Sequence, residues 1–194
     1  MALVCESSFS SWLTNNQRPN VPPTHPGQEL IYLKPGNLYI GDRPAMVTTV
    51  LGSCVAVTMH HRASGLAAIC HALQPACPMV DCVGSCPEFG RFAACVVHHM
   101  ATVFERRCIG LRDIEVKLFG GGVIIGRAAN GPKPVGLLNA EAAMQTLADR
   151  GMRLKVAEAG GEQGRKVVFD TISGGVWVKK LARPVLEDQH PRLI

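Results

Sequence analysis

A cysteine that directly follows a Gly-Ser pair is the residue of this sequence with the clearest chemical potential. Cys54 comes after Gly52 and Ser53 and opens an apolar run typical of a buried strand, so the chain turns just before the thiol. Such a turn can expose the sulfur together with nearby backbone N–H groups, which is what acyl transfer requires. We therefore predict Cys54 as a nucleophile, with the backbone at Gly52 and Ser53 as oxyanion or substrate-positioning groups.

A histidine and a threonine could complete this site. If residues 54–59 and 66–73 pair as adjacent strands, His71 comes close to Cys54, where it can lower the thiol pKa and later activate water. A third group must hold the imidazole ring, and Thr48 is the candidate. Taken one by one, the same residues also fit plain structural roles, because a cysteine in an apolar strand is often core and a buried histidine is often structural.

The elements that would position these residues follow from hydrophobic periodicity and turn signals. We expect strands at residues 31–33, 38–40, 46–50, 54–59, 65–73, 114–119, 153–158, 165–170 and 176–181, and helices at 89–108 and 139–150, the second capped by Asn139. The order predicts an α+β fold, a single domain of mixed, mostly antiparallel β-sheet layers flanked by two main helices. That domain spans residues 29–182, between a flexible Pro-rich segment at 1–28 and a C-terminal tail at 183–194.

Composition and charge exclude several classes of protein. Apolar residues make up 47% and charged residues 18% of the 194 residues, which is typical of a globular chain. No apolar run approaches the roughly 20 residues that span a bilayer, and the first residues lack the pattern of a signal peptide, so we expect a cytoplasmic protein without membrane insertion. The net charge of +5 comes from scattered basic residues with only 5% aromatics, which argues against nucleic-acid binding.

Eight cysteines leave one further possibility open. No C-x-x-C pair occurs, so we expect no metal ion and no cofactor, although a metal or redox site around Cys77, Cys82 and Cys86 stays as an alternative. The glycine run 120–122 fits the start of a dinucleotide fingerprint, but Ile125 holds the third glycine position. We interpret the run as a strand-terminating turn near the active site.

Several motifs, in order along the chain, carry a family resemblance. Residues 50–57 (VLGSCVAV), followed by His71 with Leu73 and Pro75 after it, resemble the nucleophile and base segments of the CheD family, and Thr48 stands where the family has its third catalytic residue. Residues 117–122 (KLFGGG), Gly136 with Asn139, and the Gly160 to Lys179 region resemble later motifs of the same family. Cys70, Ala72 and Gln74 depart from the usual residues around the histidine, and residues 127–134 look like an insertion.

The resemblance implies a function that the residues alone do not. CheD proteins deamidate glutamine side chains of methyl-accepting chemoreceptors to glutamate, which tunes adaptation in chemotaxis. The same resemblance implies Cys54 as nucleophile, His71 as base, Thr48 as orienting group, the chemoreceptor cytoplasmic domains as partners, the phosphatase CheC as a further partner, and a monomer. Two alternatives are a non-catalytic adaptor that binds CheC and a thiol hydrolase acting on another amide or ester.

Overall fold

The computed structural model describes residues 27–78, 86–123 and 131–182. The predicted segments 1–28 and 183–194 fall almost entirely outside these ranges, as do Cys82 and half of the suspected insertion. The elements, in chain order, are β1 (Glu29–Tyr32), β2 (Leu38–Gly41), β3 (Ala45–Leu51), β4 (Val55–His61), β5 (Leu66–Cys70), η1 (Phe89–Arg91), α2 (Ala93–Arg106), η2 (Leu111–Asp113), β6 (Glu115–Gly120), α3 (Val135–Asp149), β7 (Leu154–Ala159), β8 (Arg165–Asp170) and β9 (Val176–Lys180).

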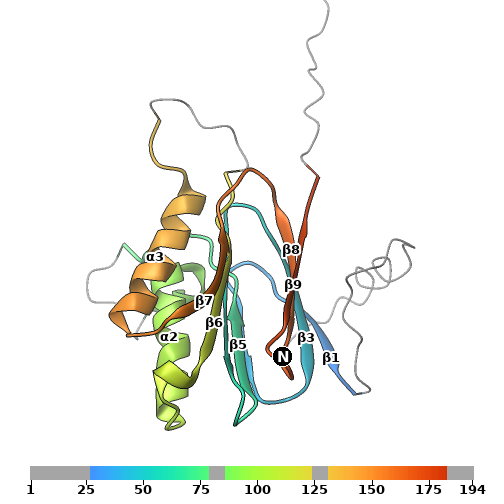
Figure 1. Cartoon of the computed structure of the whole chain (residues 1–194). Helices are drawn as coiled ribbons and strands as arrows, with labels where there is room; N and C mark the ends of the chain where they lie inside the picture. Colours follow the sequence, from blue (N-terminus) through green and yellow to red (C-terminus); the bar gives the residue numbers. More distant parts are fainter. Residues whose placement is uncertain (1–26, 79–85, 124–130, 183–194) are drawn as a thin grey trace, which may run out of the picture.

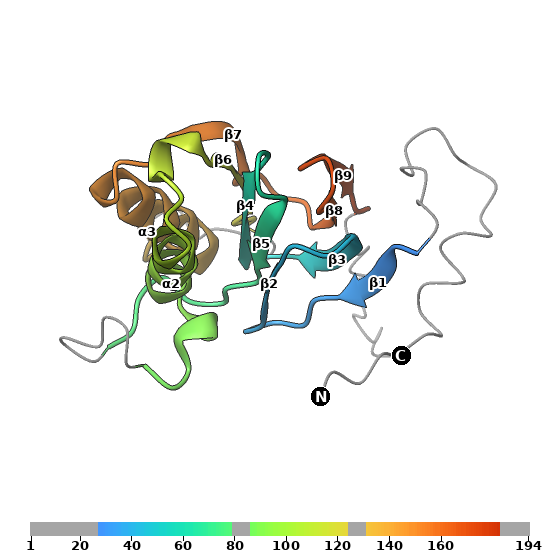
Figure 2. The ribbon, with the colours of Figure 1, turned by 90° about the horizontal axis from the view of Figure 1, so that it is seen from below.

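The described elements form three layers (Figure 1). A four-stranded sheet has the order β1-β3-β8-β9, and a five-stranded sheet has the order β2-β5-β4-β6-β7. The five-stranded sheet lies in the middle, with α2 and α3 on one face and the four-stranded sheet on the other, as the view from below also shows (Figure 2). Only the β1–β3 and β6–β7 pairs among these strands are parallel. No helix that the structure describes is long and apolar enough to cross a bilayer.

Each of the two layer interfaces has its own hydrophobic core. Alternate residues of β4 and β5 point to opposite faces, as the period of a strand requires. Val55, Val57 and Cys70 belong to the core beneath the helices. Ala56 and Ile69 belong to the core between the sheets. The middle sheet is therefore buried on both faces, and its side chains can reach either neighbouring layer.

The predicted elements are confirmed in type and order, and the fold class with them. All nine strands occur within two residues of their expected ranges, except that β5 ends at Cys70 rather than at Leu73. In the first predicted helix, Phe92, Val96, Met100 and Phe104 recur at helical spacing and are all buried in the core. One boundary is wrong: α3 begins at Val135 after Pro134, so Asn139 lies inside the helix rather than at its N-cap. The helix begins one turn earlier than expected because the carbonyl of Pro134 already accepts hydrogen bonds from Leu137 N and Leu138 N, with no side-chain cap.

Candidate active site

The turn that carries Cys54 is held by its carbonyl groups. Cys54 lies between the end of β3 and the start of β4 and is half-buried. Three successive carbonyls of the turn each accept a hydrogen bond from a segment distant in sequence: Gly52 O from Gly122 N at 2.9 Å, Ser53 O from Asn139 Nδ2 at 3.0 Å, and Cys54 O from Gly121 N at 2.8 Å. The backbone around the thiol is thus fixed on both sides of the sulfur.

The glycine run 120–122 supports this turn from behind. Gly120 has a φ of 106° and Gly121 a φ of 65°. Residues with a side chain rarely adopt such a backbone conformation. A Cβ at Gly136, in the first turn of α3, would lie 2.6 Å from the carbonyl oxygen of Gly121, so helix and turn meet backbone to backbone. The glycine run thus ends strand β6 beside Cys54, as predicted.

The strand register places Cys54 and His71 on the same face of the middle sheet. Val55 and Ala72 form a reciprocal pair, with N···O distances of 3.0 and 2.9 Å. In this antiparallel register Cys54 lies opposite Leu73, and His71 is its diagonal neighbour. Diagonal neighbours on one face lie about 7–8 Å apart at their backbones, within reach of an aromatic side chain. This is the register that the predicted approach of Cys54 and His71 requires, although no hydrogen bond joins their two side chains in the structure.

The ring of His71 is held by Thr49 of the opposite sheet. Thr49 Oγ1 lies 2.7 Å from His71 Nδ1 and 2.8 Å from the Leu33 carbonyl, to which it donates. A hydroxyl has one hydrogen, and the Leu33 bond uses it, so Nδ1 carries the proton and Thr49 accepts it. This leaves the lone pair on Nε2, which is buried and has no partner among the described residues. In this neutral tautomer, His71 can accept a proton at Nε2.

Thr48 was predicted to hold the His71 ring, but in the structure Thr49 makes this contact instead. Thr48 is adjacent to Thr49 in β3, so its side chain points to the other face of the four-stranded sheet. There its Oγ1 donates to the Val167 carbonyl at 3.1 Å. Both threonines are buried, at 1% and 0% exposure, but only the odd-numbered residues of β3, such as Val47 and Thr49, face the middle sheet.

Burial keeps both reactive groups uncharged at neutral pH. It raises the pKa of the Cys54 thiol above the ordinary value of 9.0, opposed by the residue's own backbone N–H. It lowers the pKa of His71 below 6.5, opposed by the nearby Leu33 carbonyl. The resting pair is therefore a thiol and a neutral imidazole, and the proton has to move when the sulfur attacks.

Backbone amides are available beside the sulfur. The N–H of Cys54 lies close enough to its own sulfur to favour the thiolate. Within the ranges that the structure describes, the amides of Ser53 and Cys54 make no hydrogen bond to another group. An unengaged amide next to a nucleophile can receive the negative charge of a tetrahedral intermediate. The oxyanion or substrate-positioning role of Gly52 and Ser53 stays a prediction, and the carbonyls of both residues accept hydrogen bonds that anchor the turn.

Cys70, Cys77 and Cys86, three of the other cysteines that the structure describes, lie apart from this arrangement. Cys70 precedes His71, so it points to the helix side, where full burial raises its pKa to about 12 and makes it unreactive. Cys77 and Cys86 are neighbours, with their sulfurs 3.7 Å apart. No group of three or more potential metal ligands gathers among residues 27–78, 86–123 and 131–182.

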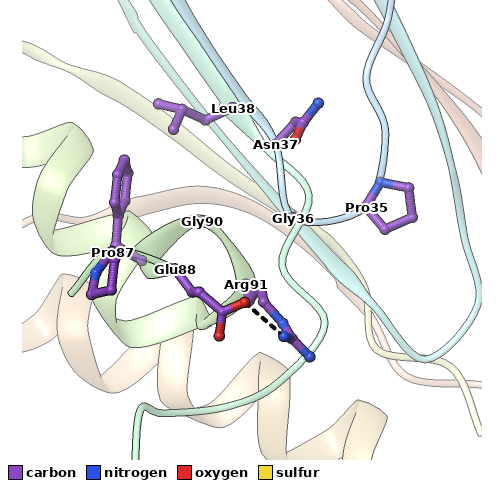
Figure 3. A pocket seen from close by; sticks show the side chains of 9 residues that line it. Pro35, Gly36, Asn37, Leu38, Pro87, Glu88, Gly90 and Arg91 are labelled. Carbon is purple, nitrogen blue, oxygen red and sulfur yellow. Dashed lines mark hydrogen bonds and ion pairs between the residues drawn. The ribbon is translucent and has the colours of Figure 1, made fainter. Parts of the chain in front are cut away.

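A cavity of about 480 Å³ lies beside the His71 segment (Figure 3). It is lined by Pro35, Gly36, Asn37, Leu38, Pro87, Glu88, Phe89, Gly90 and Arg91. Neither Cys54 nor His71 contributes to its wall. The turn at its edge is nevertheless tied to the base, because His71 N donates to Asn37 O at 2.9 Å and Gly36 N donates to His71 O at 2.8 Å. The cavity therefore adjoins the backbone of His71 without including either side chain of the candidate pair.

Comparisons with known proteins find relatives over most of this chain. A family model described as CheD chemotactic sensory transduction matches residues 84–180. A protein of Geobacter sulfurreducens named probable chemoreceptor glutamine deamidase CheD 2 is 42% identical over 159 residues, covering 82% of this chain and 94% of that protein. The chain belongs to the CheD family. A second CheD relative, the probable chemoreceptor glutamine deamidase of Maridesulfovibrio salexigens, is 33% identical, covering 79% of this chain and 92% of its own length.

The match to the CheD family model begins C-terminal to Cys54 and His71. The roles proposed for these two residues therefore rest on the geometry of the site. Among solved structures, YlmD from Geobacillus stearothermophilus overlaps in part, with a TM-score of 0.42 and 18% identity. The overlap covers 64% of this CheD chain and 50% of YlmD.

Sequence reasoning missed two residues of this CheD site. Thr49 was not distinguished from its neighbour Thr48. An alternation of apolar and polar residues along β3 would have shown which of the two faces the middle sheet. Asn139 was interpreted as a helix cap, whereas its amide donates to Ser53 O and to Leu73 O, at 3.0 and 2.9 Å. No local signal predicts these contacts, because they join residues more than 60 positions apart.

Proposed function

We propose that this CheD-family protein deamidates glutamine side chains of methyl-accepting chemoreceptors, with Cys54 as nucleophile, His71 as general base and acid, and Thr49 as the group that orients His71. The observation that carries the proposal is the state of His71. Its Nδ1 proton is held by Thr49, and its unpartnered Nε2 lone pair belongs to a ring on the Cys54 face of the sheet. The names of the relatives supply the substrate class, since both are called chemoreceptor glutamine deamidases.

The first half of the reaction forms a thioester. His71 Nε2 takes the proton of the Cys54 thiol as the sulfur attacks the side-chain carbonyl carbon of the glutamine. The carbonyl oxygen becomes an oxyanion, which the Cys54 N–H and its neighbouring amide stabilise. The carbon–nitrogen bond then breaks, and His71 returns the proton to the departing nitrogen, which leaves as ammonia. The glutamyl group stays bound to the sulfur.

The second half hydrolyses that thioester. A water molecule attacks the acyl carbon while His71 Nε2 takes one of its protons. The carbon–sulfur bond breaks, and the sulfur recovers a proton from His71. The products are a glutamate side chain and the original thiol, so the residues end in the state in which they began. A glutamyl methyl ester has the same acyl half and fits the same steps, with methanol as the leaving group.

The proposal also concerns partners and location. Chemoreceptor cytoplasmic domains are the substrates, so the protein acts in the cytoplasm, and a conversion of glutamine to glutamate provides carboxylates for receptor methylation and thus tunes adaptation. We also propose that the protein is a monomer and that the phosphatase CheC binds it.

The direct test is mass spectrometry of a receptor. The full chain is incubated with the cytoplasmic fragment of a chemoreceptor from the same organism, and glutamine-to-glutamate conversion is followed at each peptide. We expect conversion at a few specific glutamines, with release of an equal amount of ammonia. If well-folded protein converts no glutamine on several receptors but binds CheC, the adaptor function replaces the proposed one.

Adjacent threonines provide a matched pair of variants for the orienting role. We expect Thr49→Val to lower kcat by about 10- to 100-fold, because the His71 Nδ1–H loses its acceptor and the ring its fixed tautomer. Thr48→Val removes a similar buried hydrogen bond, to Val167, and is expected to leave kcat within about 2-fold. Urea unfolding of both variants compares their stabilities. Equal losses of kcat in the two variants would contradict a specific role for Thr49.

A further inference from the structure

A buried amide on α3 connects the two segments that carry the reactive groups. Asn139 is fully buried, and its Nδ2 donates one hydrogen to Ser53 O and the other to Leu73 O, at 3.0 and 2.9 Å. Ser53 immediately precedes the nucleophile, and Leu73 follows His71 by two residues. The last backbone pair between these strands is Val55–Ala72, so the amide supplies one more connection just beyond the end of the ladder.

The orientation of this amide is fixed by its partners. With the opposite assignment, Asn139 Oδ1 would face two carbonyl oxygens and both N–H groups would lose their acceptors. In the observed orientation Oδ1 is buried with no partner among the described residues. A buried acceptor left unsatisfied is unfavourable, and an apolar residue would avoid it. The two hydrogen bonds that the amide donates therefore explain why an asparagine occupies position 139.

The bond to Ser53 also aims the amide of the nucleophile. The carbonyl and the N–H of one trans peptide point in opposite directions. Fixing Ser53 O toward Asn139 therefore turns the Cys54 N–H away from α3, to the side where it lies close to its own sulfur. That N–H is the donor expected to receive the oxyanion.

We propose that Asn139 is a positioning residue that sets the oxyanion donor of Cys54 and holds the nucleophile turn against the His71 strand. It acts through the backbone of Ser53 and Leu73 and does not touch the substrate. The proposal rests on the proposed function for its reaction, but its main test needs only a reactive Cys54.

Two reactions of the Cys54 thiol distinguish a misplaced oxyanion donor from a distorted fold. Alkylation of Cys54 by iodoacetamide develops no oxyanion, whereas reversible addition of butanal, an aldehyde whose four carbons correspond to Cδ, Cγ, Cβ and Cα of glutamine, produces one. The affinity for butanal is measured by the protection it gives against alkylation, followed at the Cys54 peptide by mass spectrometry. For Asn139→Ala we expect butanal to bind about 10- to 100-fold more weakly, while the alkylation rate without butanal stays within about 3-fold.

A glutamine elsewhere in the fold provides the control. Gln28 Nε2 also donates two hydrogen bonds, to Ala45 O and Asp170 Oδ1, at the far end of β3. Gln28→Ala should leave both thiol reactions unchanged even if it lowers the unfolding midpoint. On receptor fragments, Asn139→Ala should lower kcat by the factor seen with butanal and leave KM nearly unchanged.

Three outcomes decide the proposal. A parallel fall of butanal affinity and alkylation rate in Asn139→Ala would overturn it, since that indicates a distorted fold. Unchanged butanal affinity would overturn it as well. Weaker butanal binding in Asn139→Ala, together with a wild-type chain that never deamidates a receptor, would support the role of Asn139 and reject the proposed substrate, so the two proposals fail separately. If Asn139→Ala does not fold, Asn139→Asp, which keeps the shape and loses at least one donor, is measured instead with the same expectation.

Discussion

Cys54→Ala is expected to lower the rate of receptor deamidation by about 10⁴-fold or more, because the reaction then has no nucleophile to form the thioester. The oxyanion donors and the base remain in place, but water would have to attack the amide directly. Loss of one member of a nucleophile–base unit costs almost as much as loss of the whole unit. The measurement is glutamine-to-glutamate conversion on a receptor fragment, with wild-type protein at the same concentration.

The fold should survive this change. Cys54 is half-buried, and the turn is held by backbone carbonyls rather than by the sulfur, so unfolding free energy should change by no more than about 1 kcal/mol. Cys95→Ala, another half-buried cysteine, in α2, is the control and should keep full activity. Activity of Cys54→Ala above about a hundredth of the wild type would mean that another group performs the attack.

The position of Cys54 and His71 on one face of adjacent strands could be predicted from sequence because it depends on local folding. Residues 55–61 and 66–70 are apolar segments separated by a short turn, and such a turn allows only a few antiparallel registers. The observed register brings Cys54 and His71 to the same face. A shift of one residue would have placed His71 beneath the helices, where Cys70 lies.

The choice between two adjacent threonines could not be made in the same way. Strand β3 is buried on both faces, with Met46 at 2% and Val47 at 0% exposure, so its residues show no alternation of apolar and polar types. Without alternation, sequence does not tell which face a residue occupies. A one-residue difference then decides between contact with His71 and contact with Val167.

The contacts of Asn139 could not be predicted from the sequence, for a different reason. Asparagine is a common helix cap, and a cap is the natural interpretation next to a predicted helix. The actual contacts depend on how α3 packs on the middle sheet, where Gly136 and Gly121 allow the helix to approach the turn closely. Such contacts between distant segments follow from the tertiary arrangement and not from local propensity.

His71→Gln is the second change with a very large expected effect, a loss of about 10³-fold in kcat. Glutamine is of similar size and can still reach Thr49, so the variant removes the base while it limits the cavity in a site that is only 2% exposed. Without the base, the thiol keeps its proton at neutral pH, because burial holds its pKa above 9.0. The departing nitrogen also loses its proton donor.

The dependence on pH distinguishes this role from a structural one. His71 must be neutral to act, and burial lowers its pKa, so wild-type kcat/KM should rise with pH through a midpoint below 6.5 and stay level at neutral pH. It should fall again only above 9.0, where the Cys54 proton is lost. In His71→Gln the acid limb should disappear, and the small remaining activity should increase with pH as thiolate forms. An acid limb with its midpoint above 6.5 in the wild type would instead indicate an imidazolium paired with a thiolate, and the neutral resting pair would be wrong.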